Sequence, residues 1–379
     1  MRYKILFISS WFPNKLESTN GNFVQRHAEA ASLLHDVEIL HAIGDFHQKE
    51  KYIFDDKIVN KIRTLVVYYP QTKNPIQNFF RRMNAYKKGF QKMQKPNLVH
   101  ANILQNNLFF AVWLKKKYHI PFVVSEHWSG FLTINRSKLS KINLWIAQKI
   151  AKKASYILPV SQVLKQNMQQ LNIGKKHEVV ENVINTKLFT PKKNQENSTF
   201  IFLHLSSLIS LKNPDKIILA ANRLRQKFQN FELHIGGDGD VQALNVLVEK
   251  LNANHFIKTF NEISYHEVSE KMQKSDCFVL FSDYESFSCV LLESVSSGTP
   301  VIATNVGAIP EIINEKCGII IEKSEDDLYE AMKKMLLKET NFDSPEKMHQ
   351  YVDENFSPIK IAEKFDTIYQ SVLGKKGNF

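Results

Sequence analysis

The chain alternates apolar runs of strand length with stretches of helical periodicity, and it does so twice. In the first half, runs rich in Val and Ile recur at 4–10, 37–43, 64–69, 98–103, 121–126 and 156–161. The second half repeats the pattern at 199–207, 231–237, 277–282, 299–304 and 318–322. Strands that are apolar on both faces are typical of parallel sheets covered by helices. The sequence therefore predicts an α/β protein with two doubly wound, Rossmann-like sheets.

Helical segments fill the intervals, and one polar interval separates the two halves. Helices are expected at 213–228, 240–252, 265–274, 288–297, 325–338 and 357–373. The polar stretch 186–199 contains one proline and suits a linker. We predict three parts: an N-terminal domain over 1–190, a C-terminal domain over 191–355 and a helix over 356–379. Open α/β sheets bind ligands at the carboxyl ends of their strands, so a cleft faced by both sheets is the expected site.

Charge is divided unevenly between the halves. Residues 1–190 hold 29 Lys and Arg against 11 Asp and Glu, whereas residues 191–379 hold the remaining 21 against 27. A basic half attracts an anionic membrane surface, an acidic substrate or nucleic acid. Nucleic acid is not expected as a partner, because the basic residues are dispersed and no recognised binding motif accompanies them.

The N-terminus and the cysteines predict a cytoplasmic protein. Polar residues follow the first apolar run at once, so this run is interpreted as a strand and not as a signal peptide. No stretch approaches the roughly 18 apolar residues of a spanning helix. Cys277, Cys289 and Cys317 share no CxxC spacing, which indicates neither a zinc site nor a disulfide framework. Any membrane contact is therefore expected to be peripheral, on the inner face of the cytoplasmic membrane.

The strongest chemical signal lies in residues 283–312. A buried strand ends in a polar loop that contains Glu285, and Glu293 follows eight positions later inside a helix. The start of such a helix offers backbone N–H groups and a positive dipole end, which suit a phosphate. The two carboxylates could accept hydrogen bonds from a sugar and a ribose. The alternative is that both are solvated acids near the start of a helix.

The letters ESFSCVLLE, followed by SGTPVIAT and VGAIPE, resemble the EX7E segment of retaining GT-B glycosyltransferases of family 4. The resemblance implies transfer of a hexose-type sugar from a nucleotide-sugar donor to a glycan or lipid-linked acceptor, in cell-surface polysaccharide or glycan biosynthesis. It also implies two Rossmann-like domains that face a central cleft, with 1–190 as the acceptor-side domain, 191–355 as the donor domain and the helix over 356–379 crossing back to the first domain. The residues that it places at the donor in this segment are Glu285, Ser286, Phe287, Ser288 and Glu293.

A second segment, HLSSLISLKN at 204–213, resembles the family element in which an Arg and a Lys hold the donor diphosphate. Lys212 matches the Lys, whereas Ser207 stands where Arg is usual, so one cationic contact is missing. Lys212 would supply a point charge to the leaving diphosphate. No metal and no cofactor besides the nucleotide-sugar cosubstrate are expected, because no His, Asp and Glu cluster has convincing ligand spacing.

Two further candidates lie in the first half of the chain. Gly21 follows the first strand and resembles the family's Gly-containing loop near the donor phosphates. His127, in SEHWS, resembles the family element whose His contacts the transferred sugar, so His127, Lys212 and Glu285 are the catalytic candidates. An ordinary loop glycine and a structural histidine are the alternatives. Glu126 is not assigned as a nucleophile, because the family's retaining mechanism is drawn without a clear covalent one.

Residues 73–95 combine seven basic side chains and no acid with apolar residues at helical spacing. An ordinary surface helix with an apolar stripe has this pattern. A helix that contacts an anionic membrane near a lipid-linked acceptor has it too. Both interpretations stay open at this point.

Other functions also stay open. A nucleotide-sugar epimerase or a phosphorylase of the same architecture is one class, and a non-catalytic nucleotide-sugar-binding protein is another. A nicotinamide-dependent dehydrogenase is disfavoured, because Gln242 occupies the third glycine position of a GxGxxG fingerprint that begins at Gly237.

Overall fold

The computed structural model describes residues 2–191 and 198–374, and it divides the chain into two compact units. The first runs from the N-terminus to Val183 and includes the C-terminal helix from Pro358; the second is Ile184–Ser357. The sequence predicts these boundaries at residues 190 and 355. In the expected linker 186–199, residues 192–197 lie outside the described residues.

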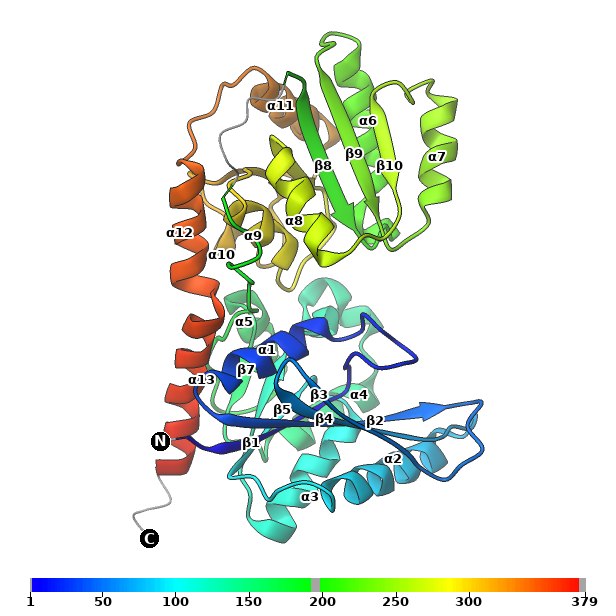
Figure 1. Cartoon of the computed structure of the whole chain (residues 1–379), viewed down its shortest axis with the longest axis vertical. Coiled ribbons are helices and arrows are strands. Elements are labelled where there is room, and N and C mark those ends of the chain that lie inside the picture. Colours follow the sequence, from blue (N-terminus) through cyan, green and yellow to red (C-terminus); the bar gives the residue numbers. More distant parts are fainter. Residues whose placement is uncertain (1, 192–197, 375–379) are drawn as a thin grey trace. The chain divides into compact units, whose positions relative to one another are not determined.

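The first unit is built on a seven-stranded sheet (Figure 1). Its strands are β1 (Lys4–Ser9), β2 (Asp36–Asp45), β3 (Ile53–Val59), β4 (Ile62–Pro70), β5 (Leu98–Asn102), β6 (Phe122–Glu126) and β7 (Ile157–Pro159). They lie in the order β3-β4-β2-β1-β5-β6-β7, and all pairs are parallel except β3 with β4. The chain continues from β1 to β2 on one side and returns to β5 on the other, so a topological switch point lies between β1 and β5.

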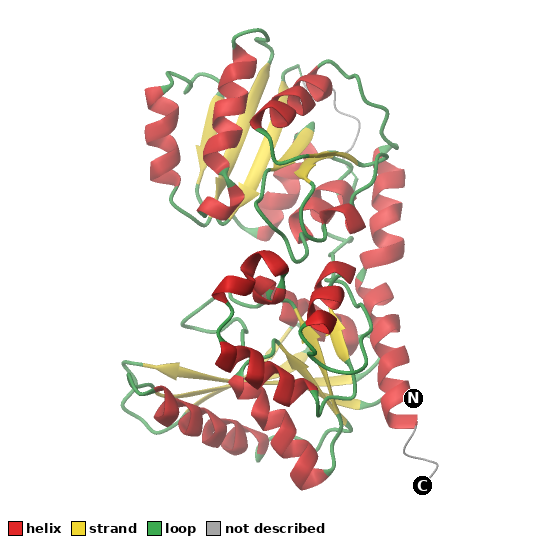
Figure 2. Ribbon diagram, turned by 180° about the vertical axis from the view of Figure 1, so that it is seen from behind, coloured by secondary structure: helices red, strands yellow, loops and turns green. Residues whose placement is uncertain are grey.

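Helices cover both faces of this sheet (Figure 2). They are α1 (Asn22–Ser32), α2 (Pro75–Phe90), α3 (Phe109–Tyr118), α4 (Lys141–Ala151), α5 (Gln162–Gln170) and α13 (Pro358–Leu373), with the 3-10 turns η1 (Asn106–Leu108), η2 (Ser129–Phe131) and η3 (Thr133–Lys138). Asn74, Ser140 and Ser161 start α2, α4 and α5, because their side-chain oxygens accept hydrogen bonds from N–H groups of the first turn.

The C-terminal helix α13 is part of the core of the first unit. The buried side chains that it contributes are Ile361, Ala362, Phe365, Ile368 and Tyr369. Phe365 packs edge-on against His27, and the Tyr369 hydroxyl lies 2.5 Å from Nδ1 of the buried His100. The apolar spacing of this segment therefore matches a face that packs on β1, β5 and α1.

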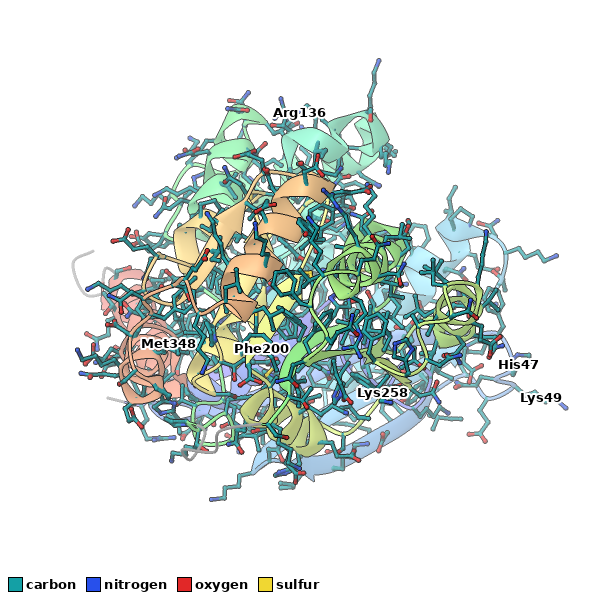
Figure 3. The ribbon with its side chains drawn as sticks, turned by 90° about the horizontal axis from the view of Figure 1, so that it is seen from above. His47, Lys49, Arg136, Phe200, Lys258 and Met348 are labelled. Carbon is teal, nitrogen blue, oxygen red and sulfur yellow. The ribbon has the colours of Figure 1, made fainter. Side chains whose placement is uncertain are left out.

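The second unit contains a six-stranded sheet in which every pair is parallel. Its strands are β8 (Phe200–Ser206), β9 (Phe231–Gly237), β10 (Ile257–Phe260), β11 (Cys277–Leu280), β12 (Val301–Thr304) and β13 (Gly318–Ile321), in the order β10-β9-β8-β11-β12-β13. The strand order reverses between β8 and β11, which is the switch point of this sheet. Lys258 lies on the edge strand β10, where its charged side chain is exposed (Figure 3).

Helices also flank the second sheet. They are α6 (Pro214–Arg225), α7 (Val241–Lys250), α8 (Tyr265–Lys274), α9 (Cys289–Ser296), α10 (Ile309–Ile312), α11 (Glu325–Leu336) and α12 (Pro345–Phe356). The 3-10 turn η4 (Ser210–Lys212) follows β8. A capping box starts α8: the Ser264 side chain accepts from the Glu267 N–H, and the Glu267 side chain accepts from the Ser264 N–H.

The sequence analysis gives no range for several of the observed elements, among them β3, β10 and α12. β3 is an outer strand whose residues are all half-buried or exposed, so it has no apolar run to mark it. β10 has four residues at the other sheet's edge. α12 follows a short polar stretch and buries only Met348, Val352 and Phe356, a spacing that the polar residues around it obscure.

The predicted basic helix 73–95 is observed as α2, and its side chains divide into two groups. Met83 and Tyr86 are buried, whereas Ile76 and Phe80 are 69% and 60% exposed. The guanidinium group of Arg81 donates to the Pro70 carbonyl at 2.6 Å, and Arg82 donates to the Tyr69 hydroxyl at 2.9 Å. Two of the basic side chains therefore bind β4, while an apolar surface remains exposed at the start of the helix.

The buried histidines predict that acid destabilises the fold. Burial lowers the pKa of His27, His41 and His204 from 6.5 to about 4, because an imidazolium loses its hydration there. Between these values the unfolded chain binds protons that the folded chain does not, so stability falls as the pH falls from about 6.5 to about 4. Glu126 opposes this trend, because burial raises its pKa to about 7. The histidines outnumber it, since burial also lowers the pKa of His100 and His127.

Urea unfolding at about pH 7.5 and about pH 5 measures this effect. The free energy of unfolding should drop at the lower pH by on the order of 1 kcal/mol per pH unit for each buried histidine. His255→Gln changes an exposed histidine and should leave the pH dependence as it is. Equal stability at both pH values would contradict the prediction.

Candidate active site

Lys212 and Glu285 meet at the switch point of the second sheet. Lys212 ends η4 after β8, and Glu285 lies in the loop after β11. The Lys212 ammonium and the Glu285 carboxylate form an ion pair, and the Ser282 hydroxyl donates to Glu285 Oε1 at 2.9 Å. Open α/β sheets bind ligands where the strand order reverses, so the structure brings the two predicted residues together at the expected place.

Both glutamates of the predicted segment are buried. Glu285 is 8% exposed and Glu293 is 5% exposed. Glu293 lies within α9, where the Tyr265 hydroxyl donates to its Oε1 at 2.6 Å. A carboxylate leaves water only at a high cost unless it is paired or hydrogen-bonded. The alternative that both are solvated acids is therefore wrong.

A glycine after β12 holds the Glu285 loop. Gly307 has a φ of 54°, and a Cβ at this position would lie 1.8 Å from the carbonyl oxygen of Glu285. The Ala308 N–H donates to the same carbonyl at 3.1 Å. Only glycine fits this combination of backbone angle and close approach. The glycine in VGAIPE thus positions the backbone of Glu285.

Asn213 ties the loop after β8 to the loop after β11. Its Nδ2 donates to the Phe281 carbonyl at 3.0 Å and to the Asp283 carboxylate at 2.8 Å, while its own φ is 46°. Lys323 forms an ion pair with the same carboxylate at 2.6 Å. A left-handed backbone at a residue other than glycine persists where its surroundings determine it. The loops that carry Lys212 and Glu285 are therefore firmly connected.

The other residues of the second unit that are predicted to bind the donor lie close to Lys212 or Glu285 in the sequence. Ser207 directly follows β8, and Ser286 follows Glu285; both are half-buried. Ser288 precedes the first turn of α9, and within the described chain its side chain makes no capping hydrogen bond. Phe287 is buried, with its ring 6.1 Å from that of Phe356, so it anchors the loop in the core.

Two predicted site residues belong to the first unit. Gly21 precedes α1 with a φ of 78°, and a Cβ there would lie 2.5 Å from the Trp11 carbonyl oxygen. His127 directly follows β6, with its ring 4.3 Å from Phe23 and 5.1 Å from His27. Burial holds the pKa of His127 well below its usual value, so the imidazole is neutral at neutral pH.

Glu126 connects the loops that follow β5 and β6. Its Oε1 accepts from the N–H groups of His127 at 2.9 Å and Trp128 at 2.8 Å, and its Oε2 accepts from Leu104 N–H at 2.7 Å. Burial raises the pKa of Glu126 to about 7, although these three N–H groups oppose the rise. Because both oxygens already accept hydrogen bonds and the side chain is fully buried, Glu126 holds the loops and is not placed to attack a substrate.

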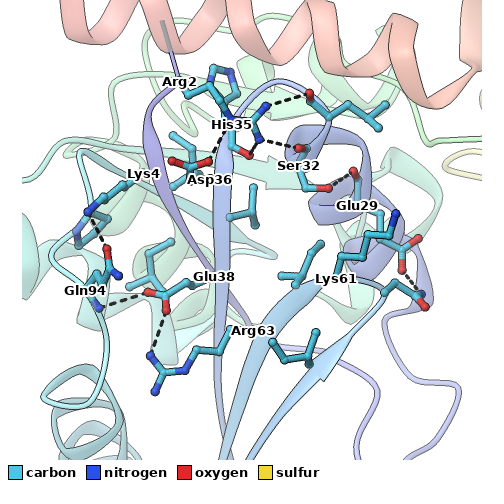
Figure 4. Close-up of a pocket in the computed structure, with 18 residues that line it drawn as sticks. Arg2, Lys4, Glu29, Ser32, His35, Asp36, Glu38, Lys61, Arg63 and Gln94 are labelled. Carbon is cyan, nitrogen blue, oxygen red and sulfur yellow. Dashed lines mark hydrogen bonds and ion pairs between the residues drawn. The ribbon is translucent and has the colours of Figure 1, made fainter.

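A hollow of about 830 Å³ lies at the opposite edge of the first sheet, where β1 and β2 begin (Figure 4). Four of its charged side chains form ion pairs: Arg2 with Asp36 at 3.0 Å, and Arg63 with Glu38 at 3.1 Å. Ligands of parallel sheets bind at the carboxyl ends, and this hollow is at the amino ends. We therefore do not place the active site here.

The described residues offer neither a metal-binding cluster nor a membrane-spanning helix. Within residues 2–191 and 198–374, no three His, Cys, Asp or Glu side chains gather closely enough to hold a metal ion. None of the helices described there combines the length and apolar character that crossing a bilayer requires.

Two family models match adjacent parts of the chain. Residues 21–188 match Glycosyltransferase Family 4, and residues 185–355 match Glycosyl transferases group 1. The two matches together cover most of the chain and meet where the structure divides its two units. The chain belongs to glycosyltransferase family 4. This membership confirms the family that residues 283–312 resemble.

Characterised relatives of family 4 align with part of this chain. One of the subunits of human phosphatidylinositol N-acetylglucosaminyltransferase is 25% identical over 197 residues, which are 51% of this chain and 41% of the relative. N-acetyl-alpha-D-glucosaminyl L-malate synthase of Bacillus anthracis is 28% identical over 176 residues, or 46% of each chain. The matched part thus spans less than half of these relatives' own lengths.

Solved structures extend the likeness to the whole fold. Sucrose-phosphate synthase from Thermosynechococcus elongatus aligns with a TM-score of 0.79 at 18% identity, over 99% of this chain and 100% of that one. HepE from Anabaena, in complex with UDP and glucose, aligns with a TM-score of 0.74 at 17% identity, over 98% and 100%. These likenesses confirm the predicted fold class, a GT-B arrangement of two Rossmann-like domains.

Sequence reasoning missed the groups that hold the candidate site residues in place. The one sequence feature that could have indicated such a group is Ser282, which stands at the end of an apolar run, three positions before Glu285. Tyr265 bonds to Glu293 from another helix, which no spacing reveals. The three backbone donors of Glu126 depend on how two loops fold, so they too carry no sequence signal.

Proposed function

We propose that this protein is a retaining glycosyltransferase that moves a hexose-type sugar from a nucleotide-sugar donor to a glycan or lipid-linked acceptor. The ion pair of Lys212 and Glu285 at the switch point of the second sheet carries this proposal. Family membership supports it, and the names of relatives support a role in cell-surface polysaccharide or glycan biosynthesis. They include O-antigen biosynthesis glycosyltransferase WbnH of Escherichia coli and an α-(1→4)-mannosyltransferase of Mycolicibacterium hassiacum.

In the proposed complex, the protein acts mainly by electrostatic stabilisation and by positioning the donor. Lys212 offers its ammonium to the donor diphosphate, and the N–H groups at the start of α9 add a positive dipole end. Glu285 accepts from hydroxyls of the transferred sugar, and Glu293 accepts from the ribose. Ser207 is uncharged. Lys212 therefore contributes a larger share of the phosphate binding than the matching lysine does in family members that have an arginine at the position of Ser207.

The retaining outcome is proposed to need no covalent enzyme nucleophile. The leaving diphosphate takes the proton of the acceptor hydroxyl on the same face of the sugar, and the protein positions both groups. His127 is proposed to contact the transferred sugar as a neutral imidazole, and Gly21 to let the backbone approach the donor. The buried Glu126, whose oxygens accept three N–H bonds, is consistent with this view.

Incubation with labelled UDP-, GDP- and ADP-sugars tests the proposal. Transfer of label to an acceptor with release of the nucleoside diphosphate supports it. Interconversion of the sugar or phosphorolysis would instead favour an epimerase or a phosphorylase. The serine at 207 favours a second candidate, a non-catalytic nucleotide-sugar-binding protein, which would bind the donor without turnover.

Glu293→Gln should weaken donor binding. The amide keeps one acceptor oxygen, which can still accept from the Tyr265 hydroxyl, but it no longer offers two oxygens to a ribose. The expected loss in binding free energy is on the order of 1–3 kcal/mol, as for a hydrogen bond to a charged group. Calorimetry with the nucleoside diphosphate measures it, and unchanged affinity would exclude this role.

Glu285→Gln should reduce turnover while leaving binding of the free nucleoside diphosphate nearly intact, because the proposed partner of Glu285 is the sugar. The amide oxygen keeps an acceptor for Ser282, so the loop is expected to stay in place. Removing a charged contact to the reacting group should lower kcat about a hundredfold. A matching collapse of nucleotide binding would show that the two glutamates have other roles.

We also propose that no metal assists the departure of the diphosphate, because Lys212 and the α9 N-terminus supply positive charge. Sugar transfer should then persist in EDTA. Complete loss on chelation, with recovery on addition of Mg²⁺ or Mn²⁺, would contradict this assignment of charge.

The exposed apolar and basic side chains of the first unit support peripheral contact with an anionic membrane. Ile76 and Phe80 on α2 are exposed, and so are Ile142 and Trp145 on α4, a second patch that the sequence analysis did not identify. Exposed basic side chains lie on the same helices and nearby in the chain: Lys88 on α2, Lys141 on α4 and Arg136 on η3 (Figure 3). Each basic side chain contributes about 1 kcal/mol at such a surface.

Vesicle co-sedimentation should show binding to acidic lipids that raised salt reverses, because exposed charges are screened over about 10 Å at 0.1 M ionic strength. Replacing Lys73, Lys88 and Lys95 with Gln should weaken it; Arg81 and Arg82 are left in place because they bind β4. The matched control replaces three exposed lysines of the second unit: Lys227, Lys250 and Lys258. Equal sedimentation with neutral and acidic vesicles would leave α2 as an ordinary surface helix.

A further inference from the structure

A cavity of about 240 Å³ lies at the carboxyl edge of the first sheet, in the unit that does not contain Lys212 and Glu285. Its walls come from the loop after β5, the loop after β6 and the first turns of α4. The six lining residues are Leu104, Gln105, Asn106, Trp128, Asn143 and Ile146. None of these side chains carries a charge, although the unit as a whole is strongly basic.

Three of the lining side chains are carboxamides: Gln105, Asn106 and Asn143. Each offers an acceptor oxygen and two N–H donors. In the part of the chain that the structure describes, none of these amide groups bonds to another protein group; Asn143 uses only its backbone N–H, which donates to the Ser140 hydroxyl. The cavity therefore presents both donors and acceptors to a ligand.

The remaining walls are apolar. Trp128 is half-buried and packs edge-on against Phe131 at 5.1 Å, and Leu104 and Ile146 complete the apolar lining. An indole offers a large, flat apolar face. A pyranose ring combines a C–H face that packs on such a surface with hydroxyl groups at its edge that bond to amides. The lining matches both properties.

The cavity walls are held in place before any ligand arrives. The Glu126 carboxylate accepts from Leu104 N–H on one wall and from Trp128 N–H on the other. Ile103, just before Leu104, is buried with a φ of 66°, a strained backbone for a β-branched residue. Its carbonyl accepts from the Ser10 hydroxyl at 2.8 Å. Walls fixed in this way lower the entropy that binding costs.

We propose that this cavity binds one uncharged sugar residue of the acceptor. The inference rests on the proposed function, because only a transferase needs an acceptor. The volume is smaller than the roughly 300–1,000 Å³ of pockets for drug-sized ligands, which fits one ring. A phosphorylated or carboxylated sugar is excluded, because its charge would lose water in a cavity whose lining offers no cation.

Binding of simple glycosides tests the proposal without any transfer reaction. The probes are methyl glucoside, methyl galactoside, methyl mannoside and N-acetylglucosamine, with glucose 6-phosphate and glucuronic acid as charged counterparts. At concentrations on the order of 10 mM, enough for a weak millimolar site, saturation-transfer NMR should detect at least one neutral probe on the full chain. Binding of the charged probes alone, or of none, would overturn the proposal.

The double variant Gln105→Ala, Asn143→Ala locates the site. Loss of two neutral hydrogen bonds should weaken binding of the neutral probe about tenfold. Gln169→Ala, an exposed amide on α5, is the matched control and should bind as the unchanged protein does. Because both altered amides lack protein partners, the fold should survive, and thermal unfolding checks this. Equal binding by the double variant would place the sugar elsewhere and overturn the proposal.

Failure of this inference and failure of the proposed function give different results. If the protein transfers sugar and the double variant leaves the KM for the acceptor unchanged, the subsite is wrong and the transferase stands. If neutral glycosides bind at this cavity but no donor supports transfer, the sugar site stands and the proposed function fails. A rise in acceptor KM of about tenfold, with donor KM unchanged, supports both.

Discussion

The ion pair of the half-buried Lys212 and the buried Glu285 is the interaction on which the candidate site depends. Two charges removed from water are stable only when their geometry is good and further hydrogen bonds satisfy them. Ser282 bonds to the carboxylate, and Gly307 allows the next loop to approach the backbone of Glu285. The loops after β8, β11 and β12 are therefore arranged around one pair of charges.

The first unit uses a buried carboxylate in a related way. Glu126 has no cationic partner; its oxygens accept three backbone N–H groups from the loops after β5 and β6. These bonds fix the residues on either side of His127 and shape the walls of the small cavity beside Trp128. In each unit, a glutamate near the end of a strand thus organises loops at the carboxyl edge. We infer that these two glutamates prepare the donor side and the acceptor side for binding.

Most of the fold could be predicted from the sequence, because the strands of the two parallel sheets are apolar on both faces. Where this signal was weak the prediction failed: β3 is polar and β10 has only four residues. For the site, the spacing of Glu285 and Glu293 and the lysine at 212 were readable as motifs. Their surroundings were not, because Tyr265 reaches Glu293 from another helix, and Asn213, which connects the two loops through Asp283, does so only through tertiary packing. The amide-lined cavity was also invisible, since its residues come from three separate segments.

Hydrogen–deuterium exchange of the full chain, with and without UDP, GDP and ADP, tests most directly whether the second unit holds the nucleotide. With the matching nucleoside diphosphate, protection should be strongest in residues 207–213 and 285–293, the loops of Lys212 and Glu285 and the start of α9. Unchanged exchange is expected at the amino edges of the sheets, including Arg2 and Arg63 in the hollow of the first unit. Protection confined to that hollow, or none with any of the three nucleotides, would contradict the assignment of the donor site to the Lys212–Glu285 pair.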